Sequence, residues 1–276
     1  MLATNAGDVA GIVGADRIAT PPLPLVLVPT TAGTGAEATR IAILSDAGEK
    51  RIVNSAHLVP VAAVLDPLLV AGLPPAITAS TGLDALSHAV EALLATSASA
   101  LTARMSLEAL ELLATALPQA IADGSDLAAR RGTLYGAYLA GLSLNAGVVL
   151  GHSIAYTIAN RVHLPHGITA AMALPYCLAY NAAATRPQLE AIAAKLPGAD
   201  HGVFAWLADL NDSLGVPASL RAAGIPAEEV PAMAAEREQS YPRPTNPVPL
   251  TGERLTELYG HLWAGDLDAC VAALAS

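Results

Sequence analysis

The chain has 276 residues, of which 53% are hydrophobic and 14% are charged, and these values predict one large domain or two smaller ones around a sizeable apolar core. The formal net charge of −10 argues against a nucleic-acid-binding protein, because no basic stripe is present to neutralise phosphates. The two cysteines, Cys177 and Cys270, lie far apart, which predicts reduced thiols in a cytoplasmic protein rather than a disulfide framework.

The first 75 residues combine short apolar runs with turns, a pattern that predicts strands. A connecting helix and loop are expected over residues 1–24. The apolar run 25–28 predicts a buried strand of the parallel type and leads directly into the loop 30–35. The glycines of this loop let backbone N–H groups approach an anionic or amide ligand, although an ordinary strand-to-helix turn is the alternative. The remaining elements expected here are a hairpin formed by 39–44 and 51–54 and a strand at 61–65.

From about residue 76 the sequence changes to long Ala- and Leu-rich segments with helical period. We therefore place a domain boundary near residue 75, between a domain 1–75 and a helical domain 76–276. Four prolines in 242–250 predict an extended surface segment. Helices are predicted over 76–96, 99–121, 126–147, 151–160, 167–183, 187–195, 201–214, 217–223, 228–236 and 251–271.

One apolar stretch is long enough to cross a bilayer, because no Asp, Glu, Lys or Arg occurs between Arg131 and Arg161. Ser143, Asn145, His152 and several glycines interrupt it, so it predicts a pair of buried helices rather than a membrane span. The N-terminus has no cationic head followed by an apolar run, and no secretory signal is expected there. We therefore expect no membrane partner.

Two pairs of side chains suggest a metal site. Asp84 and His88 are four residues apart, so on a helix they lie on one face, one turn apart. His152 and His166 form the second pair. Oxygen and imidazole ligands without thiolate suit Fe²⁺, Zn²⁺ or Mn²⁺. The surroundings are poor in charge, which predicts burial, and an ionised Asp84 buried without a partner would be costly. The alternative for the first pair is a hydrogen bond on a helix surface.

The members of the second pair lie fourteen positions apart, and Pro165 breaks any continuous helix between them. The chain must leave and return, so that the second histidine enters from a loop at the start of a helix. His163 competes for this position, and His166 is preferred because Gly167 follows it. Tyr156 lies one turn after His152 and is expected to face the same pocket, with a packed aromatic side chain as the alternative.

Four separated motifs together resemble the iron-containing (group III) alcohol dehydrogenase family, and their order agrees with it from about residue 5 to the C-terminus. The first is Pro-Thr-Thr-Ala-Gly-Thr-Gly-Ala-Glu at 29–37, and the second is Gly-Leu-Asp-Ala-Leu-Ser-His-Ala-Val-Glu-Ala at 82–92. The third runs from Gly-His at 151–152 to His-Gly at 166–167. The fourth is Asn-Pro-Val-Pro-Leu-Thr at 246–251.

The resemblance implies an α/β remnant of a Rossmann-like nucleotide-binding domain, followed by an all-α metal-binding domain in a predominantly helical chain. It implies reversible hydride transfer between NAD or NADP and a small alcohol or aldehyde, with Fe²⁺ (or Zn²⁺) as the metal, and it allows a homodimer. The metal ligands would be Asp84, His88, His152 and His166. The cofactor would contact Thr30, Thr31, Gly33, Thr34 and Lys50, and Tyr156 would face the substrate.

Two departures from the family pattern shape these expectations. The Gly-Gly-Gly-Ser turn that holds the cofactor pyrophosphate in the family does not occur in this sequence. We therefore expect the 276-residue chain to bind NAD(P)H weakly or not at all, to show little dehydrogenase activity, and to expose apolar surface on its open sheet. Tyr156 stands where many members carry a further histidine.

The alternatives to an alcohol dehydrogenase are a maleylacetate reductase, a hydroxyacid–oxoacid transhydrogenase and, in another class, a truncated, non-catalytic metal-binding relative.

Overall fold

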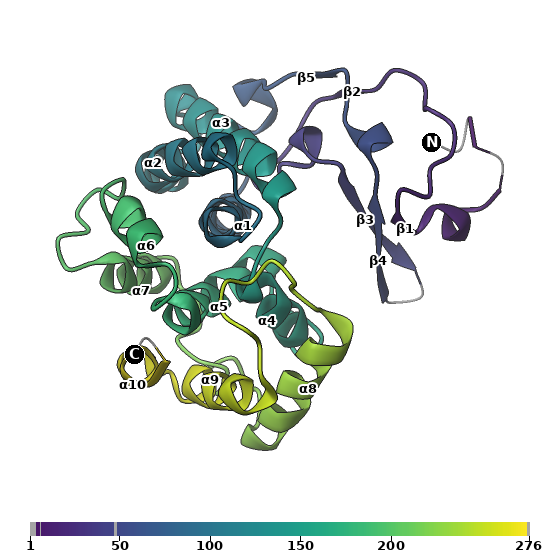
Figure 1. Cartoon of the computed structure of the whole chain (residues 1–276). Coiled ribbons are helices and arrows are strands. Elements are labelled where there is room, and N and C mark those ends of the chain that lie inside the picture. Colours follow the sequence, from purple (N-terminus) through teal and green to yellow (C-terminus); the bar gives the residue numbers. More distant parts are fainter. Residues whose placement is uncertain (1–3, 6, 47–48, 275–276) are drawn as a thin grey trace.

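The computed structural model describes residues 4–5, 7–46 and 49–274. Strands and short 3₁₀ turns occupy the part of the described chain before Leu73, and the ten α-helices of that chain follow from Pro75 onward. The strands form an arm beside the block of helices (Figure 1). The predicted order of strands followed by helices is therefore confirmed.

The strands form two small sheets. In the first, β1 (Gly14–Ala15), β4 (Glu49–Asn54) and β3 (Ile41–Asp46) lie in the order β1-β4-β3. The pairing of β3 with β4 is antiparallel, as the predicted hairpin requires, although its turn lies outside the described residues. In the second, β2 (Val26–Leu27) pairs in parallel with β5 (Ala62–Ala63). Four 3₁₀ turns accompany the strands: η1 (Val9–Ile12), η2 (Ala36–Ala38), η3 (Ala56–Leu58) and η4 (Pro67–Leu69). A further turn, η5 (Leu144–Ala146), lies in the helical part of the chain.

Two expectations for this region are wrong. The run 25–28 is not buried, because Val26 is 54% exposed, and its partner strand is flanked by Val61 at 71%. A parallel sheet is buried only where helices cover both of its faces, and these exposed fractions show that the two-stranded sheet lacks such cover. The helix expected within 1–24 is replaced by the short turn η1 and by β1.

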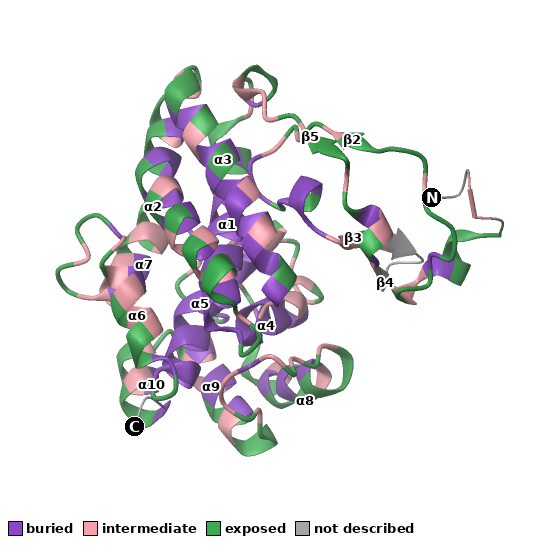
Figure 2. Ribbon diagram, turned by 45° about the horizontal axis from the view of Figure 1, so that its top comes forward, coloured by how far each residue is buried: buried purple, intermediate pink, exposed green. Residues whose placement is uncertain are grey.

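Helix α1 (Pro75–Leu94) lies at the centre of the helical block. Almost every residue from Thr78 to Leu94 is buried, as expected for a helix in the core of a helical domain. It packs against α2 (Ala100–Ala122), α3 (Leu127–Ser143) and α5 (His166–Asn181), and the buried residues concentrate there (Figure 2). The other helices are α4 (Leu150–Ala159), α6 (Arg186–Ala193), α7 (Val203–Ser213), η6 (Ala227–Glu229), α8 (Val230–Ser240), α9 (Gly252–Ala264) and α10 (Leu267–Leu274).

Two helical predictions need correction. The segment 217–223 forms turns instead of a helix, and 251–271 is two helices. Gly265 has φ 79° and closes α9 in the left-handed conformation, a conformation that glycine adopts without steric cost. The carboxylate of Asp266 then accepts a hydrogen bond from the N–H of Ala269 at the start of α10.

Among the described helices, none is by itself long and apolar enough to cross a membrane. Helix α3 with η5, taken together with α4, has sufficient length and composition, but the pair is bent by 107°.

A buried arginine on α3 makes hydrogen bonds with the segment that precedes α1. Arg130 on α3 is 1% exposed. Its guanidinium donates to the carbonyl oxygens of Leu73 and Gly124, both at 2.9 Å, and to the hydroxyl of Thr78 at 2.7 Å. These bonds fix the segment just before α1 and the first turn of α1 against α3.

Candidate metal centre

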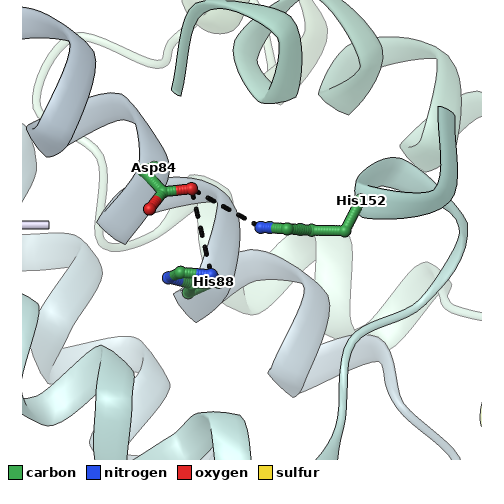
Figure 3. A group of neighbouring side chains, drawn as sticks. All are labelled: Asp84, His88 and His152. Atoms are coloured by element: carbon green, nitrogen blue, oxygen red, sulfur yellow. Dashed lines mark ion pairs between the residues drawn. The ribbon is translucent and has the colours of Figure 1, made fainter. Parts of the chain in front are cut away.

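The first pair of predicted ligands lies on α1. Asp84 and His88 are 5% and 7% exposed. Their spacing of one helical turn places Nε2 of His88 3.9 Å from Oδ1 of Asp84. Figure 3 shows both side chains projecting from α1, with His152 pointing toward Asp84 from another helix.

Helices α4 and α5 bring the second pair to the same carboxylate oxygen. Nε2 of His152 lies 3.6 Å and Nε2 of His166 lies 3.7 Å from Oδ1 of Asp84. His166 is the first residue of α5, and Gly167 allows that turn to touch α1, because a Cβ on it would lie 1.8 Å from the carbonyl oxygen of Ser80. His163 is exposed in the preceding loop. All four predicted ligands therefore converge, and the choice of His166 agrees with the geometry.

The arrangement fits a divalent cation. Oδ1 of Asp84 and Nε2 of His152 are buried and make no hydrogen bond with the described residues. Metal–ligand bonds of about 2.1 Å would place neighbouring atoms of a tetrahedral site about 3.4 Å apart, close to the observed 3.6 to 3.9 Å. Ligand atoms of Asp84, His88 and His152 all lie within 4.8 Å of one another. A cation among them would satisfy Oδ1 of Asp84 and Nε2 of His152, which have no hydrogen-bond partner among the described residues.

Electrostatics prepares these groups for a cation. Burial alone would raise the pKa of Asp84, but the neighbouring histidines hold it below its usual range, so the group is a carboxylate. Burial lowers the pKa of His88, against the opposing effect of Asp84, and favours the neutral imidazole that binds metals. Burial would also lower the pKa of His152, but Glu91 and Asp84 raise it to about 9. The site therefore attracts a positive charge, as a proton or as a metal.

A further residue at this site was not assigned from the sequence. Glu91 is fully buried, and its carboxylate oxygen Oε1 lies 2.6 Å from Nδ1 of His152. Its spacing could have revealed it, because Asp84, His88 and Glu91 occupy positions i, i+4 and i+7 of one helix and thus share a stripe.

The Asn-Pro segment holds α4 from the other side. Oδ1 of Asn246 accepts a hydrogen bond from the N–H of Leu150 at 3.1 Å, and its amide group pairs with that of Asn181 on α5. The segment 242–250 lacks regular structure, as predicted, but it is not only a surface segment, since Asn246 is buried. Its role is to fix the start of the helix that carries His152.

A pocket of about 470 Å³ opens beside the four ligands. Asp84, His88 and His166 form part of its wall, and Thr34 lines it from the predicted cofactor loop. Its other lining residues are mostly apolar and come mainly from the region of the strands, with one from η5; they include Leu25, Leu27, Ile41, Ile43, Leu58 and Leu144. One pocket therefore joins the metal ligands to the cofactor loop.

Three of the remaining cofactor candidates, Thr30, Thr31 and Gly33, are not among the residues that line this pocket. Thr30 is exposed and Thr31 is half-buried. Gly33 is buried, and a Cβ on it would lie 2.7 Å from Cβ of Thr81, so this glycine lets the loop approach α1. Lys50 belongs to β4, but its side chain lies outside the described part of the chain.

Tyr156 lines the pocket next to the ligands. Its ring stacks on His166 with a centroid distance of 5.3 Å and an interplanar angle of 9°. The guanidinium of Arg243 lies 5.8 Å from the Tyr156 ring centroid, within the range of a cation–π contact. Burial raises the pKa of Tyr156, the nearby Arg243 charge notwithstanding, so the phenol remains a hydrogen-bond donor at neutral pH.

Family profiles match nearly the whole chain. The profile described as "Fe-containing alcohol dehydrogenase family, C-terminal" matches residues 78–263, and that described as "Iron-containing alcohol dehydrogenase" matches residues 1–67. These ranges contain the four converging side chains and the loop 30–35.

Known proteins agree with the profiles. A probable alcohol dehydrogenase, EutG, of Salmonella typhimurium is 34% identical over 94% of this chain and 67% of its own length. The structure of a 1,3-propanediol oxidoreductase covers 95% of this chain and 72% of its own with a TM-score of 0.88 at 31% identity. The structure of sulfoacetaldehyde reductase from Bifidobacterium kashiwanohense, solved with NAD⁺, covers 94% of this chain and 70% of its own, with a TM-score of 0.84 at 26% identity. The chain belongs to the iron-containing alcohol dehydrogenase family, whose members are metal- and NAD(P)-dependent oxidoreductases, as its motifs predicted.

Proposed function

We propose that the chain uses Asp84, His88, His152 and His166 to hold one divalent metal, Fe²⁺ or Zn²⁺, for hydride transfer between NAD or NADP and a small alcohol or aldehyde. The observation that carries this proposal is the convergence of three histidine Nε2 atoms on one buried carboxylate oxygen, at 3.6 to 3.9 Å. When bound, the metal supplies a Lewis acid that polarises the substrate oxygen.

The chain's own side chains shape the space around that oxygen. Tyr156 is the proposed substrate-facing residue, because its phenol lines the pocket and stays protonated. Apolar side chains such as Leu144 and Ile41 line the same pocket and would exclude water from the reacting centre. Such a pocket suits a small, largely apolar alcohol or aldehyde.

The cofactor side is proposed to be the loop 30–35. Thr34 supports this assignment, because it shares the pocket with Asp84 and His88. Thr30, Thr31, Gly33 and Lys50 are proposed as further contacts through the family motif alone. We also propose the division into domains 1–75 and 76–276. The position of Pro75 at the start of α1, after the described strands, supports this division.

We further propose a cytoplasmic protein that acts on small molecules and forms a homodimer. The two buried cysteines, Cys177 and Cys270, are free thiols, as expected in a reducing compartment. Maleylacetate reductases also share this fold, so that activity is the second candidate, and the presence of all four ligands favours the alcohol dehydrogenase.

Two measurements test the proposed function. Protein loaded with Co²⁺ in place of the native metal should show a visible spectrum that shifts when an alcohol or aldehyde is added, and Asp84→Asn should abolish both the spectrum and the shift. This readout does not depend on affinity for the dinucleotide. Rates of NADH and NADPH oxidation with aldehydes, with and without a chelator, give the activity. A Co²⁺ spectrum indifferent to alcohols and aldehydes, together with chelator-insensitive rates, would contradict the proposal.

A further inference from the structure

The carboxylate of Glu91 links α1 to the start of α4. Oε1 lies 2.6 Å from Nδ1 of His152. Oε2 accepts two backbone hydrogen bonds, from the N–H of Val149 at 2.9 Å and from the N–H of His152 at 3.2 Å. One buried side chain therefore contacts both the backbone and the ring of His152.

These contacts fix the state of the His152 ring. An ionised carboxylate only accepts hydrogen bonds, so Nδ1 carries the hydrogen and, in the neutral ring, the lone pair is on Nε2. Nε2 is the atom that lies 3.6 Å from Oδ1 of Asp84. A partner on the second nitrogen of a metal-binding histidine sets its tautomer and orientation.

We propose that Glu91 is a positioning residue of the metal centre, holding His152 with Nε2 toward the metal, and that Gly151 provides the space its carboxylate needs. This inference rests on the proposed metal site. Glu91 also contributes charge, because with Asp84 it brings two buried carboxylates to the site. A divalent cation bound by neutral histidines would balance these two charges.

Gly151 provides independent support. It lies in the first turn of α4, where alanine would favour the helix more than glycine does. A Cβ at this position would lie 2.5 Å from Oε1 and 2.9 Å from Cδ of Glu91. The buried carboxylate cannot move without losing its hydrogen bonds, so this glycine is explained by the need to seat Glu91.

A purely structural role makes a different prediction. If Glu91 only capped the start of α4, its loss would lower the melting temperature but leave the metal affinity of the folded protein unchanged. If Gly151 were an ordinary helical glycine, Gly151→Ala would raise the melting temperature. The positioning role instead requires that both substitutions weaken metal binding and alter the coordination spectrum.

The test measures Zn²⁺ affinity by competition with a chromophoric chelator, and the visible spectrum with Co²⁺, in the full chain. The variants are Glu91→Gln and Gly151→Ala. Their matched controls are Glu108→Gln, at an exposed position on α2, and Gly260→Ala on α9, where a Cβ would meet no atom of the described chain within 4 Å. We expect Glu91→Gln to weaken Zn²⁺ binding by about 10- to 100-fold, Gly151→Ala to weaken it in the same direction, and both to shift the Co²⁺ spectrum. The controls should match wild type.

The outcomes separate this inference from the proposed site. A wild-type chain that binds neither Zn²⁺ nor Co²⁺ overturns both. A wild-type chain that binds metal, with Gly151→Ala binding it equally well and with the same spectrum, overturns the role of Glu91 alone. Should Glu91→Gln fail to fold, Gly151→Ala decides the question by itself.

Discussion

Two regions of the molecule differ in how much apolar surface they bury: the region around α1, α4 and α5, and the region of the strands. Around α1, buried polar groups such as Asp84 and Glu91 meet partners from distant segments, within one large apolar core. The strand region has its own cluster of only four buried apolar residues. Twelve of the sixteen large hydrophobic side chains that are exposed in the described chain lie between Val9 and Leu69.

The two regions are therefore stabilised in different ways. The helical region is held by its own packing, so a metal site can be assembled there with fixed distances. The strand region depends on contacts with the helices, such as the hydrogen bond from Asn145 to the carbonyl oxygen of Ala38 and the bonds of Arg130 just before α1. We therefore expect the two regions to respond differently to mutation and to local unfolding.

The largest effect is expected for His152→Ala. Its loss leaves Asp84 and Glu91 buried without their shared partner, which should cost about 3–5 kcal/mol of unfolding free energy and abolish metal binding. Thermal and urea unfolding, with metal analysis, measure both effects. The control is His163→Ala, at an exposed position, where a change within about 0.5 kcal/mol is expected. An unchanged melting temperature and metal content in His152→Ala would refute the central role of this residue.

The next effect concerns the connection between the regions. Arg130→Met keeps most of the side-chain volume but leaves the carbonyl oxygens of Leu73 and Gly124 without their donor, at a cost of about 3 kcal/mol. Arg131→Met alters the exposed neighbour and should be nearly neutral. Urea titrations compare the two variants, and equal midpoints would show that the buried guanidinium does not hold the segment before α1.

A smaller effect is expected for local unfolding within the native state, where the strands should open more readily than α1. Backbone amides of β3 and β4 should exchange with deuterium through local openings whose free energy lies a few kcal/mol below that of α1, because the strand region has few buried apolar contacts of its own. Exchange followed by mass spectrometry measures this. Equal protection of the strands and α1 would mean that the two regions unfold as one unit.

The last prediction is a pH dependence at the site. Since the pKa of His152 is raised to about 9 from 6.5, its protonation stabilises the metal-free fold fully below pH 6.5, and this contribution is lost as the pH rises through about 9. A metal must displace this proton, so Zn²⁺ affinity should rise by up to about tenfold per pH unit between neutral pH and pH 9. Chelator competition at pH 7.0, 7.5, 8.0 and 8.5 measures the slope. A flat profile would mean that His152 is already neutral in the metal-free protein.

Residues that act through local spacing could be predicted from the sequence. Asp84 and His88 share a helix face, and Pro165 with Gly167 marks the start of the helix that brings in His166. The hairpin of β3 and β4 and most helices were also predicted, because periodicity and turn residues are local signals.

Residues that act through distant partners were missed. The spacing of Glu91 places it on the same stripe of α1 as Asp84 and His88, but its partner is a histidine 61 positions away, and no local pattern indicates that contact. The burial of Arg130 depends on backbone carbonyl groups, which have no sequence signature. The exposed apolar surface of the open sheet was expected, but the run 25–28 was wrongly predicted to be buried, since an apolar run has the same sequence whether or not helices cover the strand.

The most direct test of the metal site is elemental analysis of the protein purified without chelators, beside Asp84→Asn and His152→Ala prepared in the same way. We predict close to one Fe or Zn per wild-type chain and almost none in either variant. A wild-type protein that contains no transition metal, and takes up none when Fe²⁺ or Zn²⁺ is added, would contradict the account.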